Sequence, residues 1–177
     1  MIDFKATPYT IKSWTVLHLP EDASAGLPSR GQVMVKGTIN GFKFATPLEP
    51  DGEGSHWLNI SDDMRSAGVK AGEAADLSIE ATKDWSEPVL PADWQKAIDT
   101  NPDIQPLWAR VTPLARWEWL RWIGSSPNPA TRQKHIEVSL DKLRKGMRRP
   151  CCFNRNMCCV PEVSKSGVLL KPAEITA

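Results

Sequence analysis

The sequence has few cysteines and no long apolar run. Its four cysteines all fall between positions 151 and 159 of a 177-residue chain. The longest apolar runs are only a few residues, whereas a membrane-spanning helix needs roughly 20. The first ten residues, MIDFKATPYT, lack the basic start and apolar stretch of a secretory signal. These absences predict a cytoplasmic protein without a membrane span, in which the thiols are reduced, metal-bound or catalytic rather than structural disulfides.

Motifs of the common catalytic sites are absent as well. The chain contains no phosphate-binding glycine loop, no His-Glu-x-x-His zinc motif and no Gly-x-Ser-x-Gly turn around a nucleophile. A site assembled from residues far apart in the sequence would leave no such motif. The sequence therefore predicts no catalytic residue. It leaves the question of an enzyme open and favours a non-catalytic role.

The net charge of +1 conceals two parts of opposite sign. Residues 1–104 carry nine Lys and Arg against sixteen Asp and Glu, while residues 105–150 carry ten against three. Such a division is typical either of a basic segment with an anionic partner or of two parts that attract each other. We favour the second interpretation. With 41% apolar residues, the chain can bury a hydrophobic core without disulfide bonds or a structural metal.

Residues 14–84 have the pattern of short strands. Their apolar residues recur with a period of two, which indicates strands that bury one face. Asn40-Gly41 supplies two residues that tolerate positive φ in a type I′ turn, so residues 32–48 predict a hairpin. The stretch SDDMRSAG predicts a short helix that Gly68 ends. Several short strands with little helix predict a small antiparallel β-barrel.

After residue 88 the pattern becomes helical. Pro88 and Pro91 would not be tolerated in a central strand, and Pro91 suits the first turn of a helix that runs to about Thr100. Two later helices each begin with an N-capping residue followed by proline and end at a glycine. They are predicted at residues 113–123, after Thr112, and at residues 129–146, after Asn128. Because their connection is short, we expect a helical hairpin.

The apolar residues of these two helices predict their buried faces. The later helix has one stripe, and the earlier helix has a stripe that further apolar residues widen beyond one face. The predicted stripes are Leu114, Trp117 and Leu120, widened by Trp119, Trp122 and Ile123, and then Ile136, Leu140, Leu143 and Met147. This is more aromatic surface than one hairpin buries alone, so we expect the excess to pack on the barrel.

Two sets of short strings resemble known bacterial families. The first resembles a family of unknown function that forms a double-split β-barrel, and the second resembles the helical domain called bacteriocin-protection, YdeI or OmpD-associated. The strings of the first set are LPSRG (27–31), GTING (37–41), LEPDGEGSHWL (48–58) and AGVKAGE (67–73). Those of the second set are TPLARWEWLRWI, ATRQKHIE and KLRKGMRRPCCF.

The resemblance implies an α+β protein. We expect a small antiparallel β-barrel of the double-split type over residues 1–88 and a helical-hairpin domain over residues 89–150. A cysteine-containing loop and an irregular C-terminal tail would follow over residues 151–177. The family name implies a link to bacteriocin or antimicrobial-peptide resistance and to an outer-membrane porin, but no set of catalytic residues.

A polar cluster in the barrel segment is the first candidate site. Arg30, Lys43, Ser55 and His56 lie near predicted loops and could hold a small anionic ligand through charge-assisted hydrogen bonds. The alternative is structural: Arg30 pairs with Asp51 or Glu53, and His56 caps a turn. We favour the structural alternative, because histidines in loops are more common than histidines that bind ligands.

The second candidate site is the cysteine cluster Cys151, Cys152, Cys158 and Cys159. Adjacent cysteines suit zinc poorly, because zinc sites favour Cys-x2-Cys spacing, whereas one cysteine from each pair could bind Cu(I). Arg148 and Arg149 would favour the thiolate for metal binding or redox chemistry. Reduced thiols with a packing role are the third interpretation. We therefore predict no cofactor other than zinc or copper at these four cysteines.

The geometry of the cysteine segment follows from its extended chain. Because successive side chains of an extended segment point to opposite sides, Cys152 and Cys158 are predicted to face each other. Cys151 and Cys159 would then be packing residues or outward thiols. Phe153 and Met157 are the expected apolar anchors of this loop.

The basic helices could bind nucleic acid, but we do not favour this role for them. Their Lys and Arg residues would neutralise phosphates, and tryptophans could stack on bases. However, the tryptophans coincide with the apolar stripe and should be buried. We therefore expect a binding protein linked to stress or antimicrobial resistance, with a ligand or protein partner that the sequence does not identify. A thiol-dependent metal or redox protein is the first alternative, and a nucleic-acid-associated protein the second.

Overall fold

The computed structural model describes residues 1–151 and 154–175, which form two compact units. The first unit combines residues 1–84 with residues 154–158 and the chain from Glu162 onward. The second contains the chain from Trp85 to Cys151 and residues 159–161. The sequence analysis placed the boundary near residue 88 and treated residues 151–177 as a separate segment. Each unit has its own hydrophobic core.

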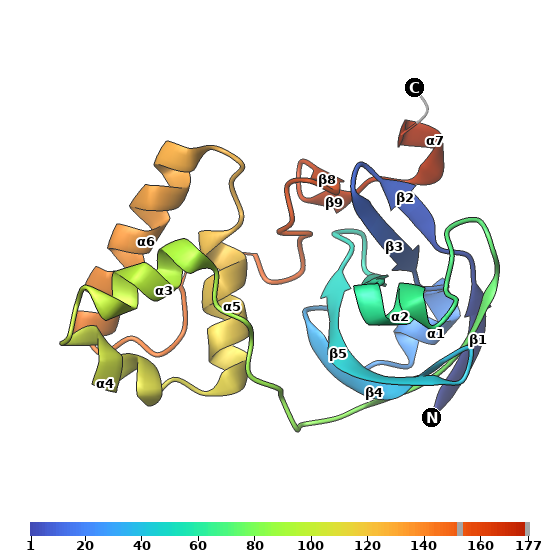
Figure 1. Ribbon diagram of the computed structural model, residues 1–177, viewed down its shortest axis with the longest axis horizontal. Coiled ribbons are helices and arrows are strands. Elements are labelled where there is room, and N and C mark those ends of the chain that lie inside the picture. Colours follow the sequence, from blue (N-terminus) through green and yellow to red (C-terminus); the bar gives the residue numbers. More distant parts are fainter. Residues whose placement is uncertain (152–153, 176–177) are drawn as a thin grey trace. The chain divides into compact units, whose positions relative to one another are not determined.

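A curved antiparallel sheet of seven strands forms the first unit (Figure 1). The strands follow the order β1-β7-β4-β5-β6-β3-β2, so this half-barrel confirms the predicted antiparallel β architecture. The strands are β1 (Ile2–Ala6), β2 (Tyr9–Ile11), β3 (Trp14–His18), β4 (Val33–Ile39), β5 (Phe42–Pro50), β6 (His56–Asn59) and β7 (Ala75–Ala81). Two short helices join them: α1 (Glu21–Ala25) and α2 (Asp62–Ser66).

The central hairpin has the predicted turn. Asn40 and Gly41 connect β4 to β5 with φ values of 48° and 83°, which are both positive as a type I′ turn requires. α2 also matches its prediction, because the Ser61 side chain accepts a hydrogen bond from the Met64 N–H and Gly68 follows with φ of 100°. Local residues therefore favour these turns, and at Asn40 the distant strand β7 adds support, because the Asp76 N–H donates to the Asn40 Oδ1 at 2.9 Å.

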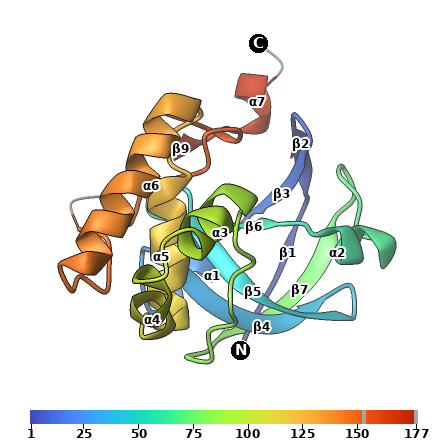
Figure 2. The same cartoon turned by 60° about the vertical axis from the view of Figure 1, so that its left-hand side comes forward.

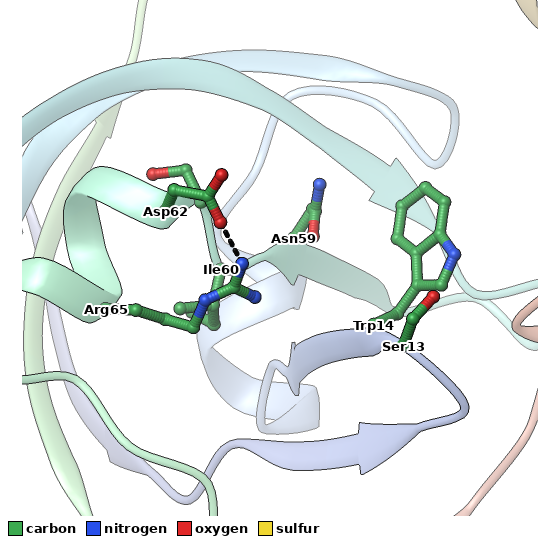
Figure 3. Close-up of a pocket in the computed structure, with 7 residues that line it drawn as sticks. Ser13, Trp14, Asn59, Ile60, Asp62 and Arg65 are labelled. Carbon is green, nitrogen blue, oxygen red and sulfur yellow. Dashed lines mark hydrogen bonds and ion pairs between the residues drawn. The ribbon is translucent and has the colours of Figure 1, made fainter.

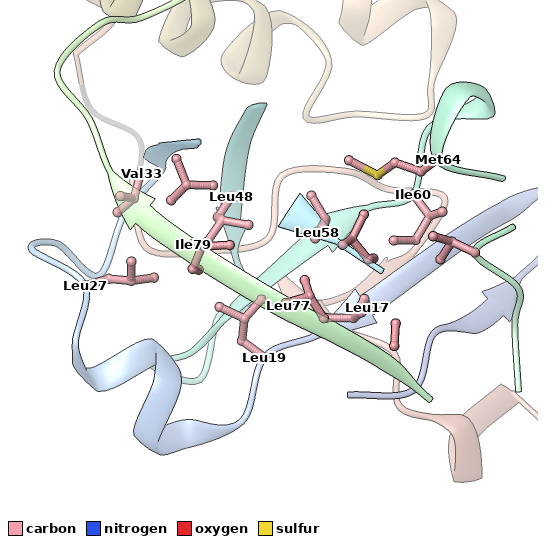
Figure 4. Packing of buried hydrophobic residues seen from close by; sticks show 14 residues of the cluster. Leu17, Leu19, Leu27, Val33, Leu48, Leu58, Ile60, Met64, Leu77 and Ile79 are labelled. Atoms are coloured by element: carbon pink, nitrogen blue, oxygen red, sulfur yellow. The ribbon is translucent and has the colours of Figure 1, made fainter. Parts of the chain in front are cut away.

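The core of the first unit lies on the concave side of the sheet (Figure 4). Alternate residues of β4 and β7 belong to it, as the period of two predicts: Val33, Val35 and Ile39, and Ala75, Leu77 and Ile79. β4 and β5 are long and curved (Figure 1), and their inward residues Val33 and Leu48 belong to the same cluster as residues of β3, β6 and β7 (Figure 4). The buried cluster contains Leu17, Leu19, Leu27, Val33, Val35, Ile39, Leu48, Leu58, Ile60, Met64, Val69, Ala75, Leu77 and Ile79.

Sequence periodicity did not find the first two strands. β1 and β2 are the edge strands of the sheet, since each pairs with one neighbour, β7 and β3 respectively. The apolar residues of β1 are only partly buried. β1 does show apolar alternation, since Ile2, Phe4 and Ala6 alternate with polar Asp3 and Lys5. Its five residues, like the three of β2, are a short signal, and the place of each strand in the sheet depends on the neighbour with which it pairs.

The C-terminal tail, expected to be irregular, contains a short hairpin within the first unit. Leu169 is buried, and its N–H donates to the Asp51 carbonyl at 2.8 Å. The Tyr9 hydroxyl donates to the Leu170 carbonyl at 2.8 Å, and Lys171 Nζ lies 2.6 Å from a Glu53 carboxylate oxygen. These contacts join the tail to the loop after β5 and to β2. The tail elements are β8 (Ser164–Lys165), β9 (Val168–Leu169) and α7 (Pro172–Ile175).

Four helices form the second unit, and three of them begin where the sequence predicts. Thr112 accepts a hydrogen bond from the Ala115 N–H, and Asn128 accepts from the N–H groups of Ala130 and Thr131. α5 and α6 run side by side (Figures 1 and 2). The helices are α3 (Ala92–Asp99), α4 (Ile104–Ala109), α5 (Pro113–Ile123) and α6 (Pro129–Arg144). No helix in residues 1–151 and 154–175 is long and apolar enough to cross a membrane.

α4 was not predicted, because Asn101-Pro102 marks the end of α3 and Pro106 argues against a new helix. In the structure, Pro106 is the third residue of α4. The N–H groups of the first turn have no partner within a helix, so proline costs little at this position. A short helix can therefore begin between two prolines.

The predicted buried face of α5 is confirmed for Trp119 and Ile123 and is wrong for its central stripe, Leu114, Trp117 and Leu120. The buried apolar residues are Ala115, Trp119 and Ile123, spaced by four, whereas Leu114 and Trp117 are half-buried. Because α5 is apolar on almost every side, its sequence does not select one face. The stripe of α6 is confirmed for Ile136, Leu140 and Leu143 and is wrong for Met147, which is half-buried.

The second unit buries aromatic side chains within its own core. Trp94 and Trp119 have no exposed surface, and the Trp94 ring meets the Trp108 ring edge-on at 5.4 Å between centroids. The predicted packing of the α5 tryptophans on the barrel stays a prediction. The core contains Trp94, Ile98, Ile104, Trp108, Val111, Ala115, Trp119, Ile123, Ile136, Leu140 and Leu143.

Candidate functional site

The structure brings Arg30 and His56 together around Ser24. The Ser24 hydroxyl lies 2.7 Å from His56 Nδ1, and Arg30 Nη1 donates to the same hydroxyl at 3.2 Å. Arg30 Nη2 donates to the Ser24 and Leu27 carbonyls at 2.7 and 3.0 Å. His56 Nε2 lies 2.8 Å from the Gly31 carbonyl. These contacts join α1 and the loop before β4 to the start of β6.

Ser24 and His56 do not form an accessible nucleophile and base. Because a carbonyl only accepts, His56 Nε2 carries the proton and Nδ1 accepts from the Ser24 hydroxyl. Burial lowers the pKa of His56, which keeps the ring neutral at pH 7. Ser24 is 1% exposed and His56 is not exposed at all. The contact therefore serves as an internal support of the barrel.

Asp51 organises the loop between β5 and β6. Its Oδ1 accepts from the N–H groups of Glu53 and Ser55 at 2.7 and 2.9 Å, and its Oδ2 accepts from His18 Nε2 at 2.8 Å. Burial by itself would raise the pKa of Asp51, but the hydrogen bonds from His18, Glu53 and Ser55 outweigh it and lower the pKa from 3.8 to about 2. Asp51 is therefore an anion throughout the neutral range.

We predict that the Asp51 carboxylate stabilises the protein at neutral pH and loses this effect in acid. Its folded pKa of about 2 lies below the unfolded value near 3.8, so the contribution is complete above about pH 4 and disappears as pH falls toward 2. Asp51→Asn should lower the free energy of unfolding at pH 7 by on the order of 1–2 kcal/mol. Urea unfolding of both proteins at pH 7 and pH 2.5 measures this, and an equal difference at both pH values would contradict it.

Two other sequence candidates lie elsewhere or have a structural partner. The Ser55 hydroxyl donates to the Leu19 carbonyl at 3.2 Å, so Ser55 supports the same loop. Lys43 lies on β5 opposite Thr38 and is not part of the Arg30 and His56 network. The structural alternative also differs in detail, because Arg30 donates to the Gly54 carbonyl at 2.9 Å, while Asp51 pairs with His18 and Glu53 with Lys171.

An open pocket of about 350 Å³ lies beside β3, β6 and α2 (Figure 3). Ser13 and Trp14 line one side, and Asp62 and Arg65 line the other. Arg65 and Asp62 form an ion pair whose charged groups remain largely solvent-accessible. The pocket thus combines an aromatic surface with hydrogen-bond donors and acceptors, a combination typical of sites for small polar molecules. Its remaining lining residues are Asn59, Ile60 and Ser61.

Sequence analysis missed this pocket because its residues come from two stretches that lie far apart in the chain, residues 13–14 and 59–65. Trp14 belongs to β3, Asn59 ends β6, and Asp62 and Arg65 belong to α2. The Trp14 ring is held edge-on against buried Trp57, with 6.4 Å between ring centroids. The spacing of Asp62 and Arg65 by three in a predicted helix was the one available signal, and it indicates an ion pair rather than a site.

The cysteine cluster lies in a segment that the structure describes only in part. Cys152 and Phe153 are outside the described residues, so the predicted Cys152 and Cys158 pair stays a prediction. Cys158 is 4% exposed and donates its backbone N–H to the Gly167 carbonyl at 2.7 Å. Cys151 and Cys159 are half-buried.

Cationic side chains contact two of these thiols, but they are not the predicted ones. Lys142 Nζ lies 3.3 Å from Cys151 Sγ, and Arg121 Nη2 lies 3.5 Å from Cys159 Sγ. Arg149, expected to act on the thiols, instead donates through Nε to Glu118 at 2.6 Å. Among the described residues, no three His, Cys, Asp or Glu side chains gather in a way that could hold a metal ion.

Many cations of the helical unit pair with carboxylates of the same unit. Arg132 of α6 binds Asp93 of α3 through two nitrogens, at 2.6 and 2.9 Å. Arg144 binds Asp103 at 2.6 Å. Such pairing leaves less positive charge to attract phosphate, which weakens the nucleic-acid interpretation. The further pairs are Arg116 with Glu87, Lys145 with Asp141 and Arg149 with Glu118.

Comparison with family models matches most of the chain. Residues 5–79 match a domain of unknown function, DUF1905. Residues 87–146 match the family described as bacteriocin-protection, YdeI or OmpD-associated. The first match covers all strands of the half-barrel except parts of β1 and β7, and the second covers the four helices. No curated protein matches the chain.

Proposed function

We propose that this chain, which belongs to the bacteriocin-protection, YdeI or OmpD-associated family and carries a DUF1905 domain, acts by binding a small polar molecule. Its family supports a role in bacteriocin protection or stress. The binding step is the specific part of the proposal. Catalysis is not required by any contact in the site.

The pocket beside Trp14 is the observation that carries the proposal. Trp14 is half-buried and held by Trp57, so one face of a ligand can lie on its ring without ordering a mobile side chain. Arg65 and Asp62 offer a donor and an acceptor on the opposite side. A ligand with a flat apolar face and polar edges fits this arrangement.

The Arg30 and His56 network supports the proposal indirectly. Both terminal nitrogens of Arg30 and both ring nitrogens of His56 already contact protein atoms. A ligand there would have to replace these buried hydrogen bonds, which costs about 1–3 kcal/mol for each group left unpaired. The open pocket imposes no such cost.

We predict that the double variant Trp14→Ala and Arg65→Ala loses protection. Sensitive bacteria that produce the unaltered chain should survive a bacteriocin challenge that kills cells with the empty vector. The number of survivors should be at least about tenfold lower with the double variant, because it removes both the stacking surface and a charged hydrogen bond. Native mass spectrometry of protein purified from these cells should show a bound small molecule only for the unaltered chain.

Lys5→Ala is the matched control. Like Arg65, Lys5 is an exposed cation paired with an aspartate, here Asp76, but it lies on β1 outside the pocket. This variant should protect as well as the unaltered chain and retain the bound molecule. Full protection by the folded double variant, or equal loss in Lys5→Ala, would overturn the proposal.

A further inference from the structure

The helical unit contains a lysine held directly against a thiol. Lys142 of α6 places its Nζ 3.3 Å from Cys151 Sγ and 4.9 Å from the centre of the Trp122 ring. The ammonium therefore lies between an aromatic face and a sulfur atom. The ring attracts the ammonium through its quadrupole, and a cation beside a sulfur atom stabilises a thiolate there.

Aromatic packing fixes the position of this lysine. The Trp122 ring stacks on His135, with 4.3 Å between centroids and 18° between planes. His135 Nδ1 lies 3.0 Å from the Trp122 carbonyl, and Trp119 meets Trp122 edge-on at 6.4 Å. Trp122 is thus supported on two sides. A rigid ring limits the rotamers of Lys142 and lowers the entropy cost of keeping its ammonium at the sulfur.

Two carboxylates of the same unit, Glu118 and Asp141, are each paired with a cation other than Lys142. Glu118 of α5 accepts hydrogen bonds from Arg149, and Asp141 of α6 is paired with Lys145 at 2.7 Å. A second thiol of the same unit, Cys159, also has a cation at its sulfur, since Arg121 Nη2 lies 3.5 Å away. Cys151 and Cys159 are both half-buried, so small reagents can reach them.

We propose that Cys151 is a thiolate site, stabilised by Lys142, that hydroperoxides oxidise to a sulfenic acid. The thiolate sulfur attacks one oxygen of the hydroperoxide, and the S–O bond forms as the O–O bond breaks. Sulfur loses two electrons to the peroxide, whose second oxygen leaves as hydroxide or alkoxide and takes a proton from solvent or the Lys142 ammonium. Cys151 becomes Cys–SOH, an oxidation that thiols can reverse. This site goes beyond the proposed ligand binding, because it lies in the other unit and uses different residues.

Lys142→Met tests the proposal because methionine keeps the stem against Trp122 and removes the charge. Alkylation of each cysteine by iodoacetamide is followed by mass mapping between pH 5.5 and 9.5. In the variant we expect Cys151 to react about tenfold more slowly at pH 6.5 and at an unchanged rate at pH 9.5, where the thiol is deprotonated in both proteins. The rate of Cys159 serves as the internal reference and should not change.

Lys145→Met is the control, since it removes a cation from the same helix without touching a cysteine. After treatment with hydrogen peroxide and dimedone, Cys151 should be recovered as the dimedone adduct or in a disulfide in the unaltered chain and in Lys145→Met. The fraction of Cys151 recovered in these forms should be several-fold lower in Lys142→Met. Circular dichroism checks that both variants are folded. An unchanged pH profile of Cys151 in folded Lys142→Met, or the same shift in Lys145→Met, would overturn the proposal.

Discussion

Replacing Trp119 with alanine is expected to lower the free energy of unfolding of the helical unit by about 3–5 kcal/mol. The Trp119 side chain has no exposed surface and lies in the cluster that joins all four helices of the second unit. Its Nε1 donates to the Arg148 carbonyl at 3.0 Å, so the substitution leaves both a cavity and a carbonyl without its donor. Guanidinium unfolding followed by the helical signal in circular dichroism measures the effect.

Trp117→Ala is the matched comparison for this prediction. Trp117 lies on the same helix, and its Nε1 also donates to a carbonyl, that of Ser86, at 2.8 Å. It is only half-buried, so less apolar area and no closed cavity are involved. We expect a loss of no more than about 2 kcal/mol. Equal losses for the two variants would show that burial in this core is not what makes Trp119 important.

The second large effect is expected from Gly37→Ala in the barrel unit. Gly37 lies in the middle of β4, opposite Phe44 on one side and Ile79 on the other. A Cβ atom here would lie 2.0 Å from the Ser78 carbonyl oxygen and 2.9 Å from the Ile79 Cα. Because both obstacles are backbone atoms of a paired strand, β4 and β7 must separate to make room. We expect a loss of at least about 3 kcal/mol.

Gly26→Ala tests whether this effect comes from the strand contact. Gly26 has φ of −72°, and its added Cβ would meet the tip of the Ile2 side chain at 3.0 Å, which can move. The change should alter the free energy of unfolding by no more than about 1 kcal/mol. Urea unfolding of both variants, with tryptophan fluorescence as the signal, gives the comparison. A Gly37→Ala protein as stable as Gly26→Ala would refute the predicted clash.

Local sequence determined the elements whose signals lie within a few residues. Asn40-Gly41 adopts two positive φ values because these residues tolerate them, and this closes the β4–β5 hairpin. Thr112 and Asn128 cap α5 and α6 through their own side chains. The short sequence motifs that resemble known families predicted both the fold class and the family, and the structure and the comparisons support both predictions. The signals for the turn and the caps lie within a few residues, although hydrogen bonds between Asn40 and Asp76 of β7 add support to the hairpin turn.

Tertiary structure alone decided which polar residues meet. Ser24, Arg30 and His56 converge because the curvature of the sheet brings α1 to the start of β6, and no spacing in the sequence encodes that distance. Trp14 and Arg65 likewise share a pocket although 51 positions separate them in the numbering.

The same distinction explains the errors in the helical unit. The sequence placed arginines next to the cysteines, but in the folded chain Glu118 binds Arg149, and Lys142, nine positions away, contacts Cys151. The sequence of α5 is apolar on several faces, and only packing against α3, α4 and α6 determines that the face with Trp119 is buried. A few neighbouring residues decide caps and turns. Which face of a helix is buried, and which charged residues pair, depends on the free energy of burying one set of side chains rather than another, and only the assembled unit defines that free energy.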